Sequence, residues 1–314
     1  MIRKHLLLKA SAPDKCGSFF YCLQNFILSF EIKFVNLHHK KKHHIMKKTT
    51  PIALLTGAIM LIGCNNRPQN PEPVMPEEIE EPAREITYTT YSAGDSNNAY
   101  LIRYKATLPE LEDDFAVENI RTTLMGVFNA PNANDPQTAL ERHMQQTKIE
   151  FTEMHNQMIT DDVWDFDPPQ LESCATITHL SSNKYFSTYV VSASYYGGGA
   201  HGGFNKSYMV FDNSTGKQIT EKDFLTNKSA ITNLLRTSAL KQYIRENSEF
   251  EVFDKDYITA NGNFFFTPDS LIYQYGEYEI AAYCFGRPMF RLHKNDVKQY
   301  LNPDSPVYKY WFGE

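Results

Sequence analysis

The sequence predicts an α+β fold. Two stretches between residues 115 and 158 repeat apolar residues every three or four positions, as in a helix that is buried along one side. From Leu171 onward the pattern changes to short apolar runs separated by polar turns, which is typical of β-strands. The chain also contains 19 Tyr and 21 Phe, residue types that pack well on pleated sheets.

The predicted helices can be placed from their buried stripes and their capping residues. The first spans residues 115–128. The second has Asp135 as N-cap and Pro136 at its first position, both favourable at a helix start. Its apolar stripe, which we interpret as core, consists of Leu140, Met144, Thr147, Phe151, Met154 and Met158. A further helix begins at Thr226 or Ser229, and a short one that is capped by Asn295 ends near Leu301.

The predicted strands alternate in polarity or flank turn residues. The first covers residues 99–108. Three pairs follow, each joined by a polar turn: 174–180 with 185–196, 207–212 with 217–220, and 264–266 with 271–275. Residues 289–292 form a last strand. We therefore expect folded structure to begin near Arg84 and to continue to the end of the chain.

An export signal starts at Met46. Two lysines precede an apolar stretch, residues 49–62, that is too short to span a bilayer. The stretch ends in Leu-Ile-Gly-Cys64, which resembles the bacterial lipobox. This pattern predicts cleavage before Cys64 and a lipid anchor on its thiol, so that the protein would be attached to a membrane of the cell envelope.

The segments on either side of this signal do not resemble a folded domain. Residues 1–45 are basic and histidine-rich, and they precede a complete signal with its own Met; we interpret them as a spurious extension before residues 46–63. Residues 64–83 contain five prolines and an acidic run, Glu77-Glu78-Ile79-Glu80-Glu81, which predicts an extended linker.

The charge of the predicted mature chain excludes nucleic acid as the expected partner. Residues 1–63 hold 10 Lys/Arg and 2 Asp/Glu, so the remainder has 31 − 10 = 21 basic and 37 − 2 = 35 acidic residues, a net charge of −14. Nucleic-acid binding requires basic surfaces. A negative field suits a cationic partner, although solubility alone would also explain it.

The most unusual stretch is Tyr195-Tyr196-Gly197-Gly198-Gly199-Ala200-His201-Gly202-Gly203. Five glycines in seven residues between two strands allow positive φ angles or a close backbone approach. The stretch predicts either a ligand loop with exposed amides and aromatic surface or a structural bulge. The candidate binding residues are Tyr195, Tyr196, Gly198, Gly199 and His201.

This glycine-rich stretch carries a family resemblance. Together with Phe211-Asp-Asn-Ser-Thr-Gly-Lys-Gln-Ile-Thr220, Phe266-Thr-Pro-Asp-Ser-Leu-Ile-Tyr273 and Tyr278-Glu-Ile-Ala-Ala-Tyr283, it resembles the domain called DUF3298. Ala282 stands where that family usually has Pro. Residues 84–190 resemble the DUF4163 (PdaC-like) half that often precedes it, which would make residues 191–314 the DUF3298-like half.

The resemblance implies an antiparallel sheet with packed helices and a non-enzymatic binding role. Relatives include the extracellular part of an anti-sigma factor that senses lysozyme and the non-catalytic part of a peptidoglycan deacetylase. The sequence lacks the metal-binding pattern of the deacetylase and the membrane helix and sigma-binding segment of the anti-sigma factor. The resemblance therefore implies recognition of lysozyme or of peptidoglycan fragments, and neither deacetylation nor sigma-factor signalling.

Other residues of the sequence form weaker catalytic, metal-binding or disulfide patterns. Ser181-Ser182-Asn183-Lys184 matches an acyl-enzyme motif but falls in a predicted turn, and His201 alone would be the base of a hydrolase. The acidic cluster of residues 161–167 does not have calcium-loop spacing, and no histidine pair has zinc spacing, so we expect neither metal nor cofactor. Cys174 and Cys284 would form a disulfide or remain two buried thiols.

Three functions follow from these observations. The first is an envelope lipoprotein that binds lysozyme or peptidoglycan without catalysis. The second is a structural or assembly lipoprotein that binds another envelope protein. The third is a hydrolase that uses His201 or Ser181. The sequence favours the first.

Overall fold

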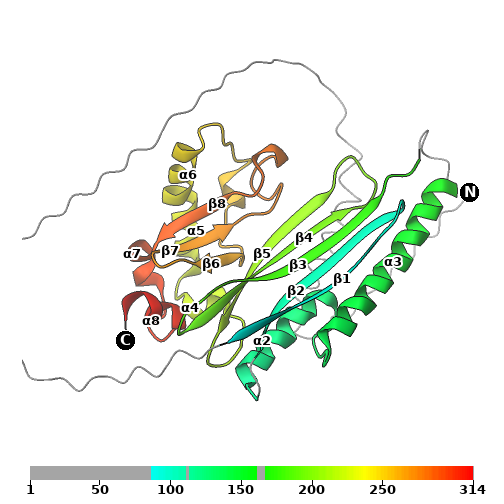
Figure 1. Cartoon of the computed structure of the whole chain (residues 1–314). Helices are drawn as coiled ribbons and strands as arrows, with labels where there is room; N and C mark the ends of the chain where they lie inside the picture. Colours follow the sequence, from blue (N-terminus) through cyan, green and yellow to red (C-terminus); the bar gives the residue numbers. More distant parts are fainter. Residues whose placement is uncertain (1–85, 111–112, 161–166, 314) are drawn as a thin grey trace, which may run out of the picture. The chain divides into compact units, whose positions relative to one another are not determined.

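The computed structural model describes residues 86–110, 113–160 and 167–313, and these form two β-sheets with helices packed against them (Figure 1). The predicted signal segment, Cys64 and the linker lie outside the described residues. In the part of the chain that the structure describes, no helix is both long enough and apolar enough to cross a membrane. The α+β class predicted from the sequence is confirmed.

The larger sheet has five strands in the order β1-β2-β3-β4-β5. Its strands are β1 (Thr87–Ser96), β2 (Tyr100–Glu110), β3 (Leu171–Ser182), β4 (Phe186–Tyr196) and β5 (Gly203–Asp212). All neighbours are antiparallel except β2 and β3, which run parallel because two helices connect them. These helices are α2 (Phe115–Met125), which continues as the 3-10 turn η1 (Gly126–Phe128), and α3 (Pro136–Thr160). The expected antiparallel sheet therefore needs correction at this one pair.

The second half of the chain builds a smaller antiparallel sheet and most of the short helices. The sheet contains β6 (Phe264–Phe266), β7 (Ser270–Gln274) and β8 (Met289–His293). The helices are α4 (Glu221–Phe224), α5 (Lys228–Leu234), the π-helical η2 (Leu235–Ala239), α6 (Leu240–Glu246), α7 (Lys294–Val297) and α8 (Pro306–Phe312). The 3-10 turns are η3 (Lys255–Tyr257), η4 (Tyr283–Phe285) and η5 (Lys298–Tyr300).

The two sheets are joined along β5 and β6 through one asparagine side chain. Asn263 accepts a hydrogen bond from the backbone N of Tyr208 at 2.9 Å and donates through Nδ2 to the carbonyl of Lys206 at 3.0 Å. The rings of Tyr208 and Phe265 stack beside it, with centroids 4.2 Å apart. Because the Asn263 side chain supplies both a donor and an acceptor, it takes the place of the backbone hydrogen bonds that would join β5 and β6 in a continuous sheet.

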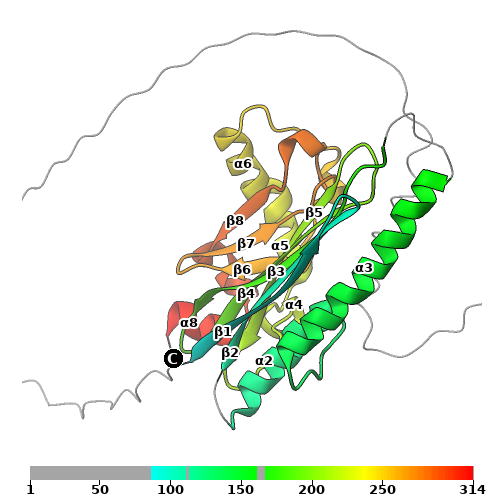
Figure 2. The ribbon, with the colours of Figure 1, turned by 45° about the vertical axis from the view of Figure 1, so that its right-hand side comes forward.

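Two hydrophobic clusters hold this arrangement together. One lies between α2, α3 and one face of β2–β5, and its largest buried side chains include Tyr104, Phe128, Phe151, Tyr189 and Phe211. The other fills the space around the small sheet and includes Phe224, Phe264, Tyr273, Tyr275, Phe290 and Trp311. Figure 2 shows α3 running beside the large sheet, where its predicted stripe contributes Leu140, Met144, Thr147 and Phe151 as buried residues.

The helix starts follow local capping chemistry. Asp135 accepts hydrogen bonds from the backbone N of Gln137 at 3.0 Å and of Thr138 at 3.4 Å, as the sequence predicts. The later caps differ from expectation by a few residues. Asn227 caps α5, and the ring Nδ1 of His293 accepts from Asn295 at the start of α7. Each carries a side-chain acceptor that satisfies an otherwise unpaired N–H.

Candidate functional site

The glycine-rich stretch forms the tip of the β4–β5 hairpin, beyond the last strand pair between Tyr195 and Gly203. Gly198 is buried with φ +88°, and a Cβ there would lie 3.0 Å from Cε of Met158 on α3. Gly199 is exposed, and a Cβ there would meet nothing within 4 Å. Gly198 therefore serves the fold, because only glycine accepts both constraints, whereas Gly199 presents its backbone to solvent.

The two tyrosines before the loop point in different directions. Tyr196 donates its hydroxyl hydrogen to the carbonyl of Gly199 at 2.9 Å and so closes the loop on itself. Tyr195 packs its ring on Phe151 of α3, with centroids 5.9 Å apart. Burial, and then the charge of Glu150, raise the pKa of the Tyr195 hydroxyl. These two rings therefore contact α3 and the loop itself.

His201 instead meets two tyrosines from a distant part of the sequence. Its ring centroid lies 4.9 Å from that of Tyr283 and 6.2 Å from that of Tyr278, and the two tyrosine rings are 5.5 Å apart. Tyr278 is 48% exposed and Tyr283 is 41% exposed. The three rings form a surface cluster that we call the aromatic face. The loop after β4 and the connection between β7 and β8, which build it, lie at the same end of the molecule in Figure 1.

Tyr278 is held in an unfavourable backbone conformation. Its φ is +61°, in the left-handed region that a bulky residue rarely adopts. The carboxylate of Glu279 fixes this turn, since its oxygens accept from the backbone N of Gly276 at 2.6 Å and from Nδ2 of Asn261 at 2.9 Å. Such strain persists where the surroundings determine the conformation, and it gathers at binding sites.

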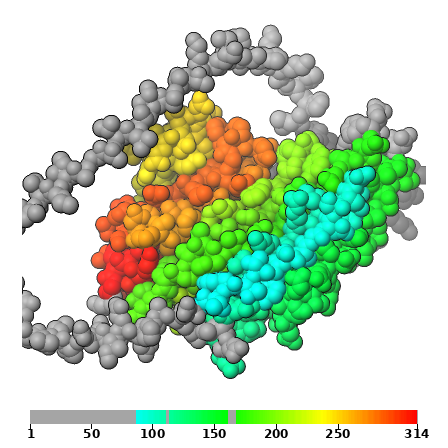
Figure 3. Space-filling model, viewed as in Figure 1, coloured from blue at the N-terminus to red at the C-terminus, as the bar shows by residue number. Residues whose placement is uncertain are grey.

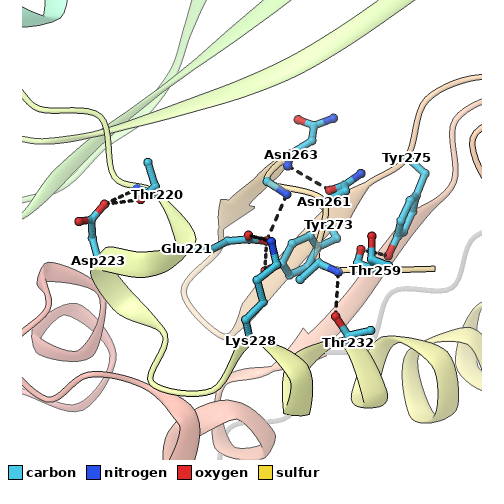
Figure 4. Close-up of polar contacts among 12 residues, drawn as sticks. Thr220, Glu221, Asp223, Lys228, Thr232, Thr259, Asn261, Asn263, Tyr273 and Tyr275 are labelled. Carbon is cyan, nitrogen blue, oxygen red and sulfur yellow. Dashed lines mark hydrogen bonds and ion pairs between the residues drawn. The ribbon is translucent and has the colours of Figure 1, made fainter. Parts of the chain in front are cut away.

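Asn261 belongs to a partly buried polar network that supports this turn (Figure 4). The carboxylate of Glu221 accepts from the backbone N of Gly262 at 3.1 Å and from the hydroxyl of Tyr273 at 3.0 Å, and it pairs with Lys228. Burial, followed by the charge of Glu221, raises the pKa of Tyr273 well above its ordinary value. The network ties residues 261–263 to α4, and through Asn261 it reaches Glu279.

A second contact ties the hairpin to the β7–β8 connection. Glu277 accepts from Nη1 of Arg287 at 3.0 Å and from the backbone N of Phe204 at 3.4 Å. The guanidinium of Arg287 lies over the Phe204 ring, 4.0 Å from its centroid. The ion pair and the cation–π contact hold the two segments that build the aromatic face in one position relative to each other.

An acidic segment borders the aromatic face. Residues 249–256 contain Glu249, Glu251, Asp254 and Asp256 against one lysine, and all four carboxylates are exposed. The segment pairs with the β7–β8 connection through the bridge between Val252 and Ala281 and through the hydrogen bond from Phe253 N to Ile280 O at 2.9 Å. Exposed rings of Phe253 and Tyr257 lie within or directly after it. The surface beside the aromatic face is therefore negative and partly apolar.

The side chain of Arg236 anchors the far end of the acidic segment. It donates to the carbonyls of Ile258 at 2.8 Å and Asp256 at 2.7 Å, and it pairs with the Asp256 carboxylate at 3.2 Å. Arg236 lies in η2, a stretch of π-helix, a form that recurs near functional sites. Tyr278, Tyr283 and the acidic segment were not predicted from the sequence as site residues. The quoted Tyr-Glu-Ile-Ala-Ala-Tyr run was the signal available for the two tyrosines.

The hydrolase alternatives find no matching arrangement at Ser181. The Ser-x-x-Lys motif ends β3 instead of opening a helix. The neighbouring Ser182 lies 2.8 Å from Nε2 of His179 and 2.8 Å from Oγ of Ser187, which in turn donates to Asn213 at 2.7 Å. Because the Ser187 proton goes to Asn213, Ser182 donates to Ser187 and must accept from His179. In that arrangement His179 is a donor to Ser182 and not its base.

The cysteines and the predicted metal chemistry can also be compared with the structure. Cys174 is a partly buried free thiol in β3, and Cys284 is an exposed free thiol in η4. The disulfide alternative is therefore not present, and the alternative of two buried thiols is wrong for Cys284, which lies exposed in a 3-10 turn. Within residues 86–110, 113–160 and 167–313, no group of three His, Cys, Asp or Glu side chains is arranged to hold a metal ion. The acidic cluster of residues 161–167 lies almost entirely outside the described part.

Comparison with known proteins finds a family match within the second half of the chain. Residues 217–295 match the family described as "Protein of unknown function (DUF3298)". A DUF3298 domain is thus present. A crystal structure of a DUF3298 family member from Bacteroides fragilis is similar to this chain, with a TM-score of 0.62 at 14% identity, and the alignment covers 74% of this chain and 99% of that one. At this identity the likeness concerns the fold.

A second solved structure, of a DUF3298 family protein from Pseudomonas aeruginosa, aligns with a TM-score of 0.47 and 13% identity over 71% of this chain and 96% of that chain. No curated protein matches this sequence. The matched range contains the acidic segment, Tyr278 and Tyr283, while His201 precedes it. The DUF4163-like half stays a prediction, and its predicted boundary after residue 190 falls inside β4, so the large sheet extends across it.

Proposed function

We propose that this protein is a non-enzymatic binding lipoprotein of the bacterial cell envelope, anchored through Cys64, and that the aromatic face with its acidic border binds a cationic protein of the lysozyme type. The observation that supports this most is the meeting of His201 with Tyr278 and Tyr283 at the surface, beside residues 249–256. Exposed tyrosines on a fixed backbone bury area on binding with little loss of conformational entropy.

Charge supports a cationic protein as the class of partner. The acidic segment carries four carboxylates against one lysine, and the predicted mature chain has a net charge of −14. A positively charged protein would be drawn to this surface, whereas an acidic one would be repelled. The resemblance to a lysozyme sensor agrees with this sign, and recognition of lysozyme is therefore our leading proposal over muropeptides.

The test is a calorimetric titration of the purified protein with a cationic lysozyme at low and at high salt, with muropeptides in parallel. We expect saturable lysozyme binding that weakens with salt, because rim charges are screened. Tyr283→Ala should weaken binding about tenfold or more, since central aromatic residues dominate such interfaces. Phe115→Ala, an equally drastic change at a 76% exposed ring on α2, is the matched control and should leave affinity unchanged.

The outcomes separate the candidate functions. Binding of muropeptides alone would make the domain a wall-binding module. Absence of heat with both ligands would remove the proposal and favour the assembly alternative, in which another envelope protein is the partner. Loss of lysozyme binding in Phe115→Ala to the same extent as in Tyr283→Ala would show that the aromatic face is not the binding surface.

A further inference from the structure

One face of the large sheet is not covered by helices around Ser192 and Ser194 of β4, whereas at the Phe186 end the same face packs on Tyr310 of α8. Helices α2 and α3 pack on the opposite face, where the buried cluster lies. Figure 3 shows the uncovered face, with β1 to β4 at the surface in cyan and green. Since strand side chains alternate between faces, the strand register gives the residues that this open face presents.

The middle of the open face carries small side chains between two rows of longer ones, and we call this strip the trough and the two rows its margins. Its floor consists of the small side chains Cys174 and Thr176 on β3, paired with Ser194 and Ser192 on β4. One margin is Arg103 and Lys105 on β2, the register partners of Cys174 and Thr176. The other margin is Phe204 and Lys206 on β5, the partners of Ser194 and Ser192. The margins are three strand spacings apart, about 14 Å.

The open face is positively charged, whereas the net charge of the protein is negative. Arg103 and Lys105 are exposed and Lys206 is partly exposed, with its Nζ 5.5 Å from the Tyr208 ring centroid. The acidic residue on the trough is Glu172 at its end, which accepts from the hydroxyl of Ser194 at 2.6 Å. Residues 64–314 carry a net charge of −14, so a basic trough is a local exception.

We propose that this trough binds a linear glycan that carries carboxylates. The three cations, Arg103, Lys105 and Lys206, are spread over two margins, and this spacing suits a glycan with one carboxylate per sugar or fewer. The hydroxyls of Thr176, Ser192 and Ser194 can form hydrogen bonds with sugar hydroxyls. The strong negative charge of the rest of the protein opposes polymers of high charge density such as nucleic acid or polyphosphate.

The trough continues toward the aromatic face. Phe204 forms its margin and carries the Arg287 guanidinium over its ring, and Arg287 pairs with Glu277, the residue before Tyr278. A chain lying along the strands would leave the trough near these residues. The two surfaces are nevertheless built from different residues, so glycan binding does not depend on the proposed binding of a cationic protein.

The test measures binding of the full-length protein to polygalacturonate, with a neutral chitin oligosaccharide and inorganic polyphosphate as comparison polymers. We expect saturable, salt-sensitive binding to polygalacturonate that is stronger than binding to either comparison polymer. The double variant Arg103→Gln/Lys105→Gln should bind about tenfold more weakly, as expected for loss of two partly solvated charge contacts. The control Lys241→Gln/Arg245→Gln removes two exposed cations from α6 and should bind like the unaltered protein.

Three results would overturn the proposal: no binding to polygalacturonate, tighter binding to polyphosphate, or equal weakening in the α6 control. Both double variants change exposed residues, so their unfolding temperatures should match that of the unaltered protein and a folding defect would be visible. Tyr283→Ala separates the two proposals, because it should weaken lysozyme binding and leave polygalacturonate binding unchanged.

Discussion

Tyr273→Phe tests whether the network around Glu221 supports the site. Tyr273 is fully buried, and its hydroxyl donates to the Glu221 carboxylate at 3.0 Å, so the change removes one hydrogen bond to a charged acceptor and no ring packing. Such bonds contribute about 1.5–3 kcal/mol net. Glu221 keeps its bonds from Gly262 and Lys228, so it is not left unpaired and the lower part of this range applies.

We therefore expect Tyr273→Phe to lower the free energy of unfolding by about 2 kcal/mol, which corresponds to a fall in Tm of roughly 4–8 °C for a domain of this size. Urea and thermal unfolding measure both quantities. Tyr257→Phe is the control, because the Tyr257 side chain is 60% exposed and its hydroxyl is accessible to water. A loss below about 0.5 kcal/mol, or one equal to that of Tyr257→Phe, would refute the role given to this network.

Three further predictions follow from individual residues. Gly216→Ala should prevent folding or cost more than about 3 kcal/mol, because φ is +67° and the new Cβ would lie 2.0 Å from the carbonyl oxygen of Ala116; yield and unfolding temperature measure this. Gly198→Ala should cost about 1–2 kcal/mol, whereas Gly199→Ala should be neutral in the same unfolding assay. Burial lowers the pKa of His143, so the unfolded chain takes up the proton first and stability should fall as pH drops through about 6.5; a Tm series against pH should be flatter in His143→Gln.

Helices and strands were predicted correctly where their own residues determine their ends and their buried side. The second helix is one such case, since Asp135, Pro136 and a stripe ending at Met158 agree on its start and its buried side, and α3 spans Pro136–Thr160. The β3–β4 hairpin is another, because strong strand residues flank Asn183, whose side chain accepts from the backbone N of Tyr185 at 2.8 Å. Local periodicity and turn chemistry were sufficient here.

Elements that depend on tertiary contacts were not predicted. Strand β1 alternates weakly, and most of its side chains are exposed or partly exposed, so it has little hydrophobic signal. The Gln137 side chain of α3 forms hydrogen bonds with the backbone N and O of Ser92 in β1. No local sequence pattern indicates this contact. The parallel pairing of β2 with β3 likewise depends on two intervening helices, as a crossover requires.

The candidate site shows the same limit at a finer level. The glycine-rich loop was found because its composition is unusual, but composition could not show that Tyr195 packs on α3 and Tyr196 on its own loop. The partners of His201 lie about 80 residues further along the chain, at Tyr278 and Tyr283. Only the fold, through the β5–β6 junction at Asn263, brings the two segments together.

The fixed geometry of this junction explains how two surfaces of opposite charge, which we propose to be binding surfaces, can lie side by side. The aromatic face and the trough meet at Arg287, whose guanidinium is bonded to Glu277 and lies on Phe204. The acidic segment is fixed by its pairing with Ala281 and by Arg236, and its Asp256 forms an ion pair with Arg236. A cationic protein and an anionic glycan would then occupy neighbouring surfaces, and the bound glycan would add negative charge that attracts the cationic protein further. Binding of polygalacturonate should therefore increase lysozyme affinity at low salt and lose this effect at high salt.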